Sequence, residues 1–325
     1  ARVKADRKKL EIEQASWDWA DTTIHGSATV AFDDNFHTSV RASAGTFAIY
    51  GLMRDMGVPG AWADARIDGH ADVSGTLKPL LLEGKGGGTF TDILVASMDV
   101  RKAPADRIVL HVPRPVVAKE VAIKVDNEGM RFEGGVDDGL TRASGVFQVY
   151  YDVNKGLYID ADSEQADFAS VDGRIADLQF TGVGRGHMHV DGPQSGPVLT
   201  AALEIGGFSL EGFSFGDATG RVHLFRNELR FEDVVAVKNA RSRYGGTVAL
   251  TFGDVVDAKG ATLEGPKLGV DIGFDPADAA DLRAVIPATY TTGVLAFLRD
   301  DLDVAGPVKG RFVGEGAVGD GTCDH

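Results

Sequence analysis

The chain has 325 residues, enough for two ordinary domains or one elongated repetitive domain. It contains 42 glycines, about twice average usage and without a collagen-like period, which is typical of many short strands joined by tight turns. The formal net charge of −15 argues against nucleic acid as a partner, because phosphate binding requires clustered Lys and Arg. It argues equally against tight docking on an anionic membrane surface.

Cysteine content and terminal sequences say little about the compartment. Cys323 is the one cysteine, so no internal disulfide is possible. No apolar run approaches the ~20 residues that a membrane-spanning helix requires. The chain begins with Ala1 and shows no signal peptide, so we expect it to be a segment of a longer protein.

In the first third of the chain, the pattern from Tyr50 to Met56 predicts a short helix. Further on, Gly84-Lys85-Gly86-Gly87-Gly88-Thr89 has some likeness to a phosphate-binding loop. The full signature requires a glycine four residues before the Gly-Lys pair and a helix after it, and both are missing. We therefore expect a hairpin turn at this segment.

The middle of the chain alternates apolar and polar residues, as from Val146 to Tyr150 and from Leu157 to Asp160. Such a period of two predicts strands with one buried and one solvated face. Turn signals recur about every 8–12 residues, the spacing of consecutive hairpins. They are Asp126 to Gly129, Gly134-Gly135, Asp137 to Gly139, Asn154 to Gly156, Arg226 to Glu228 and Gly245-Gly246. The prediction is an antiparallel β-meander.

Two segments carry side chains that bind metals in other proteins. His187, His189 and Asp191 would share one face of a strand, a spacing that suits zinc. Asp160, Asp162 and Glu164 could bind calcium, but Gln165 stands where an EF-hand loop requires glycine. We predict that both segments are polar strand faces, that no metal or other cofactor is bound, and that the chain has no catalytic centre.

Near the C-terminus, the segment from Pro276 to Val285 predicts a second helix, with Asp275 as its N-cap and Pro276 at its first position. Both helices are short enough to be plugs or connectors.

Self-comparison indicates a repeat of about 115 residues. An Asp-Val-x-Gly-like strand ends at Gly75, Gly192 and Gly306, and the segment from Leu52 to Pro59 is similar to the one from Leu282 to Pro287. We expect one continuous repetitive β segment over residues 1–325, with approximate units 1–90, 91–207 and 208–325. With about 25 strands ~4.8 Å apart, it would extend roughly 120 Å.

The helical turn from Asp281 to Pro287, followed by an expected strand from Thr292 to Leu295 and then by a Val-x-Gly strand at Val304-Ala305-Gly306, resembles a landmark of the AsmA-like superfamily, TamB type. The segments from Val73 to Gly84 and from Gly207 to Phe252 are similar to its repeated strands, whereas the family's C-terminal domain is missing. The resemblance implies an all-β, elongated antiparallel meander folded into an open trough (a β-taco), with short helical connectors. It also implies a periplasmic location in a Gram-negative bacterium, an inner-membrane anchor elsewhere in the parent chain, and phospholipid as the partner.

On this interpretation, large apolar side chains of alternating strands line a lipid-binding groove. The expected lining residues are Leu210, Phe213, Phe215, Val222, Leu224, Leu229, Phe231, Val235, Val237, Val248, Leu250 and Phe252. Acyl chains would gain about 0.8 kcal/mol per buried methylene there. The alternation is equally compatible with a closed sandwich or barrel core. Two rival functions also stay open: a scaffold that docks to an outer-membrane β-barrel by strand pairing, and an enzyme or carbohydrate-binding β-solenoid.

Overall fold

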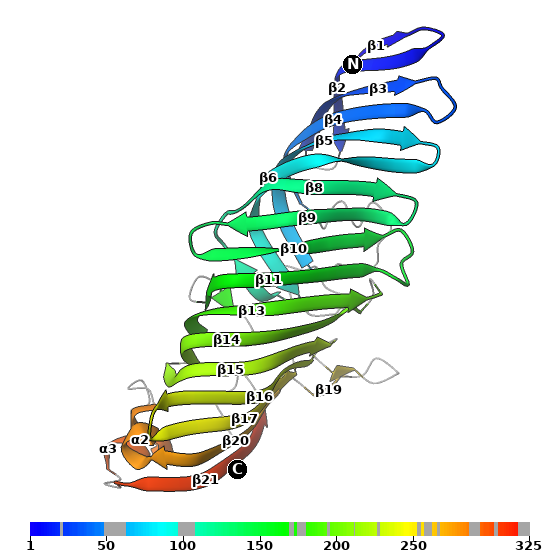
Figure 1. Cartoon of the computed structure of the whole chain (residues 1–325). Helices are drawn as coiled ribbons and strands as arrows, with labels where there is room; N and C mark the ends of the chain where they lie inside the picture. The colour runs from blue at the N-terminus through cyan, green and yellow to red at the C-terminus, as the bar shows by residue number, and fades with distance from the viewer. Residues whose placement is uncertain are drawn as a thin grey trace.

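The computed structural model of the chain is almost entirely β-sheet (Figure 1). The structure describes residues 1–19, 22–48, 63–96, 108–168, 172–173, 180–193, 196–210, 212–225, 228–251, 255–256, 262–264, 267–285, 293–301 and 305–317.

One sheet contains 19 of the described strands, and all pairings between its strands are antiparallel. The first nine are β1 (Arg2–Ala5), β2 (Lys9–Trp19), β3 (Thr22–Ala31), β4 (His37–Ala48), β5 (Ala63–Leu77), β6 (Leu80–Ala96), β7 (Ile108–Val112), β8 (Val116–Asp126) and β9 (Gly129–Asp137). The next five are β10 (Thr141–Tyr150), β11 (Leu157–Asp167), β12 (Asp172–Gly173), β13 (Phe180–Gly192) and β14 (Val198–Leu210). The last five are β15 (Phe213–Phe225), β16 (Glu228–Asn239), β17 (Ser242–Thr251), β20 (Lys267–Asp278) and β21 (Pro307–Ala317).

Chain order and spatial order agree along most of this sheet. Each strand pairs with the next, except that β7 and β12 form a side branch from the far end of β6. Two short strands, β18 (Val255–Val256) and β19 (Thr262–Glu264), pair separately. Among the described strands, the sheet stays open and does not close into a barrel. The predicted fold class, an elongated antiparallel meander folded into an open trough, is therefore confirmed.

Irregular positions in the strands accompany the folding of the sheet into a trough. The pairing register shifts at Ile12/Ala15 in β2, at Lys119/Ala122 in β8 and at Phe231/Val234 in β16. The shifted segments contain Gln14, Glu120 and Asp233, each with φ near +51°. A β-bulge bends its strand and increases the local twist, so repeated bulges turn the sheet from one wall into the other. In Figure 1 parts of the strands pass behind β8–β10 as a second wall.

The trough is shorter than the sequence predicts. With β7 and β12 set aside, 17 of the described strands follow one another, which at about 4.8 Å each gives roughly 77 Å. The strands are longer than expected because many cross both walls; β6 alone has 17 residues. Fewer strands therefore use the same length of chain.

Several glycine-rich segments lie inside strands, and here the predicted turns are wrong. Gly84 to Thr89 belongs to β6, Gly134-Gly135 to β9 and Gly245-Gly246 to β17. The backbones of adjacent strands approach closely at these positions: a Cβ on Gly84 would lie 2.0 Å from the carbonyl oxygen of Asp72. The turns predicted at 126–129, 137–139 and 154–156 are confirmed.

Two short helices accompany the sheet near the C-terminus. The structure places α2 at Ala279–Val285, later than predicted, because 276–278 continue β20. Asp278, not Asp275, caps it by accepting a hydrogen bond from the amide of Ala280 at 3.0 Å. The helix α3 (Gly293–Asp300) lies where the resemblance predicted a strand from Thr292 to Leu295, so that prediction is wrong. The helix expected at Tyr50 to Met56 lies outside the described residues. Among the described helices, none has the length and apolar character that crossing a membrane requires.

Two of the three repeat glycines occupy equivalent places. Gly75 and Gly192 both lie near the end of a strand that leads into a hairpin, with positive φ. Gly306 also has positive φ but immediately precedes β21, whose first residue pairs with the last residue of β20. The division into three units stays a prediction.

Candidate functional site: an apolar inner face

One face of the sheet carries an unbroken row of apolar residues and glycine, and we call this face the inner face. Residues that pair directly in adjacent strands share a face, so the register defines the row from β1 to β20. Its members are Val3, Ile12, Ala28, Val40, Val73, Gly84, Ile123, Phe132, Phe147, Ile159, Val190, Leu199, Leu224, Leu229, Leu250 and Leu268. We call it the inner row. It runs perpendicular to the strands, along the axis of the trough.

The neighbouring residues point to the outer face and are mostly polar. One row there consists of Lys4, Glu11, Thr29, Ser39, Ser74, Glu83, Lys124, Arg131, Gln148, Tyr158 and Asp191. Ion pairs cross between strands on this face, as from Arg41 Nη2 to Asp72 Oδ2 at 2.6 Å. Because these pairs are exposed, each contributes little stability. The sheet is thus a single amphipathic layer.

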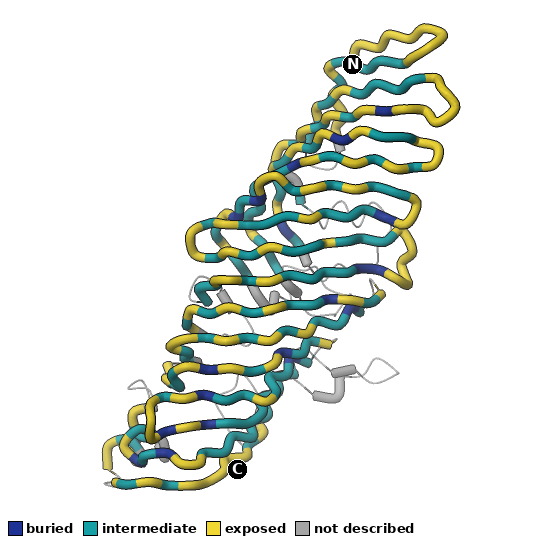
Figure 2. The backbone as a smooth tube through the Cα atoms, in the orientation of Figure 1, coloured by how far each residue is buried: buried dark blue, intermediate teal, exposed yellow. Residues whose placement is uncertain are grey.

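The inner face is only partly covered over most of its length. Figure 2 shows that intermediate and exposed residues dominate the sheet. Phe147 is 39% exposed although its ring lies 5.9 Å from that of Phe132, centroid to centroid. Within the described part of the chain, each strand packs chiefly against the strands that it pairs with, and the wall behind β8–β10 belongs to the same open sheet. Val73 and Val190 are buried, whereas most members of the inner row are intermediate in exposure. A partly exposed apolar row of this kind is a candidate interaction surface.

The C-terminal end of the inner face is more closely packed. Val222, Leu229 and Leu250 form a buried cluster in the inner row and beside it, and Leu250 is only 2% exposed. A second cluster, around Ala236 and Tyr244, is contacted by Leu282 of α2. The helix α2 packs on β15 and β20, so it covers the inner face there.

Most of the predicted lining residues that the structure describes lie on this inner face. They are Phe213, Phe215, Val222, Leu224, Leu229, Phe231, Val248 and Leu250. The backbone of Leu210 pairs with that of Phe213, its side chain is not described, and Phe252 lies outside the described residues.

Val235 and Val237 lie on the outer face, contrary to the simple alternation. The bulge between Phe231 and Val234 shifts the period by one residue, so Val234 and Ala236 point inward instead. Val237 is consequently 42% exposed, opposite Asp217 and Arg243.

The predicted lining residues lie between 210 and 252, so the larger part of the inner row was not predicted. Val40, Val73, Ile123, Phe132 and Val190 lie in it and extend it to the N-terminal and middle strands. Apolar and polar residues alternate around all five of these residues. The glycines inside β6, the strand between β5 and β8, obscured this alternation.

The two candidate metal segments lie on the outer face of β11 and β13. His187 Nδ1 is 3.0 Å from Asp162 Oδ1, and His189 Nδ1 is 3.2 Å from Asp160 Oδ2. The first of these cross-strand pairs is exposed and the second is partly buried, in agreement with the predicted polar faces. Among the described residues, no group of three or more His, Cys, Asp or Glu side chains is arranged to hold a metal ion.

Comparison with known proteins found no matching family model, no similar curated protein and no similar solved structure. The resemblance to AsmA-like proteins therefore stays a prediction from the sequence.

Proposed function

We propose that this chain is a non-catalytic conduit that carries phospholipid, or another lipid with acyl chains, along the inner face of its trough. The observation that supports this proposal is the inner row itself. It passes through strand after strand without a polar side chain, and the described strands form an open sheet that is not closed into a barrel around it.

An acyl chain on this surface would replace water along the row, gaining about 0.8 kcal/mol for each methylene that becomes fully buried. Hydrocarbon forms no hydrogen bonds with the lining, so a step from Phe132 to Phe147 breaks none. Adjacent strands lie about 4.8 Å apart and present similar apolar side chains, which keeps the barrier between neighbouring positions low. These properties suit movement better than tight binding at one place.

We extend the proposal to location and partners on the strength of the resemblance alone. The chain would then lie in the periplasm of a Gram-negative bacterium and pass lipid between the inner and outer membranes. The alternative function in the same location is that of a scaffold, which would dock to an outer-membrane β-barrel during protein assembly.

The test is site-specific photo-crosslinking from the two faces of one strand. A photoreactive amino acid at Phe147 points into the trough, and one at Ser144, on the same strand β10, points outward. With the chain expressed in bacteria or mixed with phospholipid vesicles, we expect lipid adducts at Phe147 and few at Ser144. Equal labelling at both positions, or none at Phe147 in a folded chain, would contradict lipid conduction and favour a scaffold.

A further inference from the structure

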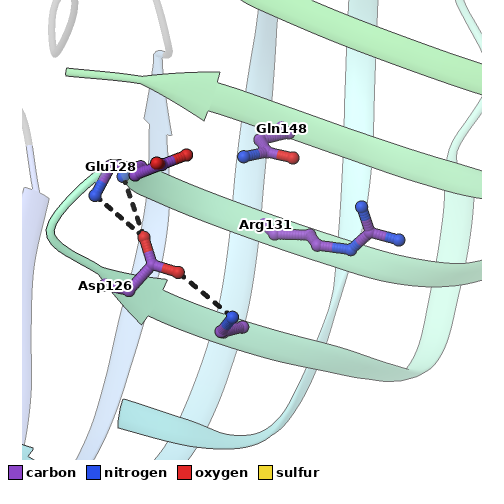
Figure 3. A pocket seen from close by; sticks show the side chains of 6 residues that line it. Asp126, Glu128, Arg131 and Gln148 are labelled. Carbon is purple, nitrogen blue, oxygen red and sulfur yellow. Dashed lines mark hydrogen bonds and ion pairs between the residues drawn. The ribbon is translucent and has the colours of Figure 1, made fainter. Parts of the chain in front are cut away.

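A polar hollow lies on the outer face directly behind the inner row, at the tip of the β8–β9 hairpin (Figure 3). It has a volume of about 300 Å³ and is lined by Lys124, Asp126, Glu128, Gly129, Arg131 and Gln148. We call it the headgroup hollow. Lys124, Arg131 and Gln148 lie opposite one another on the adjacent strands β8, β9 and β10.

The sheet is one layer thick at this hairpin, so the hollow and the trough share the same strands. Val125, Met130 and Val149 alternate with the hollow's residues and point to the inner face. The turn from Asp126 to Gly129 lies where β8 ends and β9 begins, so the inner and outer faces of the sheet meet at this turn. A molecule with an apolar and a polar part can therefore contact both faces by passing over this turn.

The charges of the headgroup hollow balance, with two cations and two carboxylates. Asp126 is already engaged: it accepts hydrogen bonds from the amides of Glu128 (2.9 Å) and Gly129 (3.3 Å) and pairs with Lys124 at 3.1 Å. These contacts hold the pKa of Asp126 below its ordinary value. Asp126 therefore shapes the turn.

Lys124 keeps further N–H donors beside its pair with Asp126, and the charged groups of Arg131 and Glu128 are accessible to a ligand. Arg131 pairs with Glu133 at 3.2 Å, but both side chains are largely exposed, so a ligand can compete for the guanidinium. Within the described residues, the Glu128 carboxylate and the Gln148 amide have no hydrogen-bond or ion-pair partner. In Figure 3 the side chains of Arg131 and Gln148 lie side by side, with the turn and Glu128 at one end.

We propose that the headgroup hollow binds the zwitterionic head of a phospholipid, a phosphodiester joined to a primary ammonium group, while the acyl chains of that lipid lie on the inner face. This inference rests on the proposed function. Arg131 and Lys124 supply charge-assisted donors for the phosphate oxygens, and Glu128 accepts from the ammonium. A head that carries only negative charge leaves Glu128 without a cation and places its carboxylate near the phosphate.

The experiment is native mass spectrometry of the full chain with an equimolar mixture of phosphatidylethanolamine, phosphatidylglycerol and diacylglycerol of identical acyl chains. The unaltered chain should retain the ethanolamine lipid in excess. Glu128→Gln should lower the ethanolamine-to-glycerol ratio roughly two- to fivefold, the range of an exposed ion pair. Lys124→Gln with Arg131→Gln should lower both phospholipids relative to diacylglycerol.

Matched controls remove the same charges elsewhere on the outer face. Glu164→Gln on β11 and Lys85→Gln on β6 are exposed and should leave all ratios unchanged. Glu128→Lys should reverse the preference in favour of phosphatidylglycerol, a gain that a folding defect cannot imitate.

The outcomes separate the two proposals. If the variants bind lipid with unaltered ratios, or Glu128→Lys leaves the preference unchanged, the hollow is not a headgroup site while the conduit stands. If the folded chain binds none of the three lipids, the conduit fails and the hollow with it. Binding of soluble glycerophosphoethanolamine as tightly as of the intact lipid would overturn the link between the hollow and the trough.

Discussion

Asp281 on α2 accepts a hydrogen bond from the hydroxyl group of Ser242, a residue that is 1% exposed at the start of β17. The same carboxylate oxygen accepts a second hydrogen bond from the side-chain amide of Asn239 at 2.7 Å. Ser242 in turn accepts from the amide of Asp278 at 2.9 Å. This network fixes the short helix to the β16–β17 turn, and it holds Leu282 over the inner face.

Replacement of Asp281 by alanine should release α2, because the buried hydroxyl of Ser242 loses its acceptor. We expect a local loss of about 1–2 kcal/mol, seen as faster hydrogen exchange in 279–285 with little change in β2–β6. Asp34→Ala, in an exposed turn far along the chain, is the control and should change neither region. Unchanged exchange in α2 would show that Leu282 alone holds the helix.

The same network should make the attachment of α2 depend on pH. Hydrogen bonds from Ser242 and then from Asn239 lower the pKa of Asp281 below its ordinary value of 3.8. A carboxyl group whose pKa is lowered by folding stabilises the folded form above its ordinary pKa, and this stabilisation is lost as the pH falls through the folded value. Exchange in α2 should therefore accelerate below about pH 3.8, and Asp281→Ala should lack that dependence.

Leu250 and Phe147 should separate stability from lipid binding. Leu250 is 2% exposed, so Leu250→Ala should lower the free energy of unfolding by about 2–5 kcal/mol. Phe147 is 39% exposed, so Phe147→Ala should cost less than about 2 kcal/mol. Phe147→Asp should abolish lipid retention because a charge would interrupt the inner row, yet keep the β-sheet circular dichroism spectrum. Unfolding by Phe147→Asp would indicate a closed core at this position.

Gly84 lies inside β6, where a side chain cannot be accommodated. The Cβ of Gly84→Ala would lie 2.0 Å from the carbonyl oxygen of Asp72, so β5 and β6 would have to separate. We expect a loss of more than about 2 kcal/mol in urea unfolding. Gly196→Ala is the matched control, because its Cβ would meet nothing within 4 Å and its φ is not strained. Similar stabilities of the two variants would show that the strands can move apart freely.

Arg114 links the loop before β8 to the β9–β10 turn through Asp138 and Thr141. Burial works to raise the pKa of Asp138, but hydrogen bonds from Arg114 and from the amides of Thr141 and Leu140 outweigh it and lower that pKa. Arg114→Ala should cost about 3 kcal/mol, since it leaves a carboxylate with a 6% exposed side chain without its cation.

The control for this variant is Arg41→Ala, which breaks an ion pair with Asp72 whose side chains are 74% and 53% exposed. It should cost less than about 1 kcal/mol in the same unfolding measurement. Equal losses would mean that burial does not decide the strength of these pairs.

The sequence was sufficient to predict strands and their antiparallel order, because alternation reports which side chains share a face. It was not sufficient where the backbone departs from alternation. In β16 the residues Leu229 and Phe231 point inward as predicted, whereas the bulge at Asp233 turns Val235 and Val237 outward. In the sequence, the alternation of apolar and polar residues shifts by one position after Phe231. That shift is the signal that would have revealed the bulge.

Glycine was the second source of error, because one residue type serves two purposes. At Gly139 it permits a φ of +84° in a turn, whereas at Gly84 and Gly246 it permits close approach of neighbouring backbones inside the sheet. Local sequence does not distinguish the two uses, since the second depends on strands that are distant along the chain. The openness of the trough likewise depends on what faces the inner row, which no local pattern encodes.

The single-layer sheet has a mechanical consequence. Its interstrand hydrogen bonds point along the trough axis, so a pull on the two ends loads the ladders in series, and the weakest ladder sets the breaking force. Apart from the terminal β1–β2 ladder with four paired positions, the shortest ladder between consecutive described strands of the main order is β8–β9, with six. Under tension we expect the molecule to part there first, separating into two halves that each retain their own folded strands.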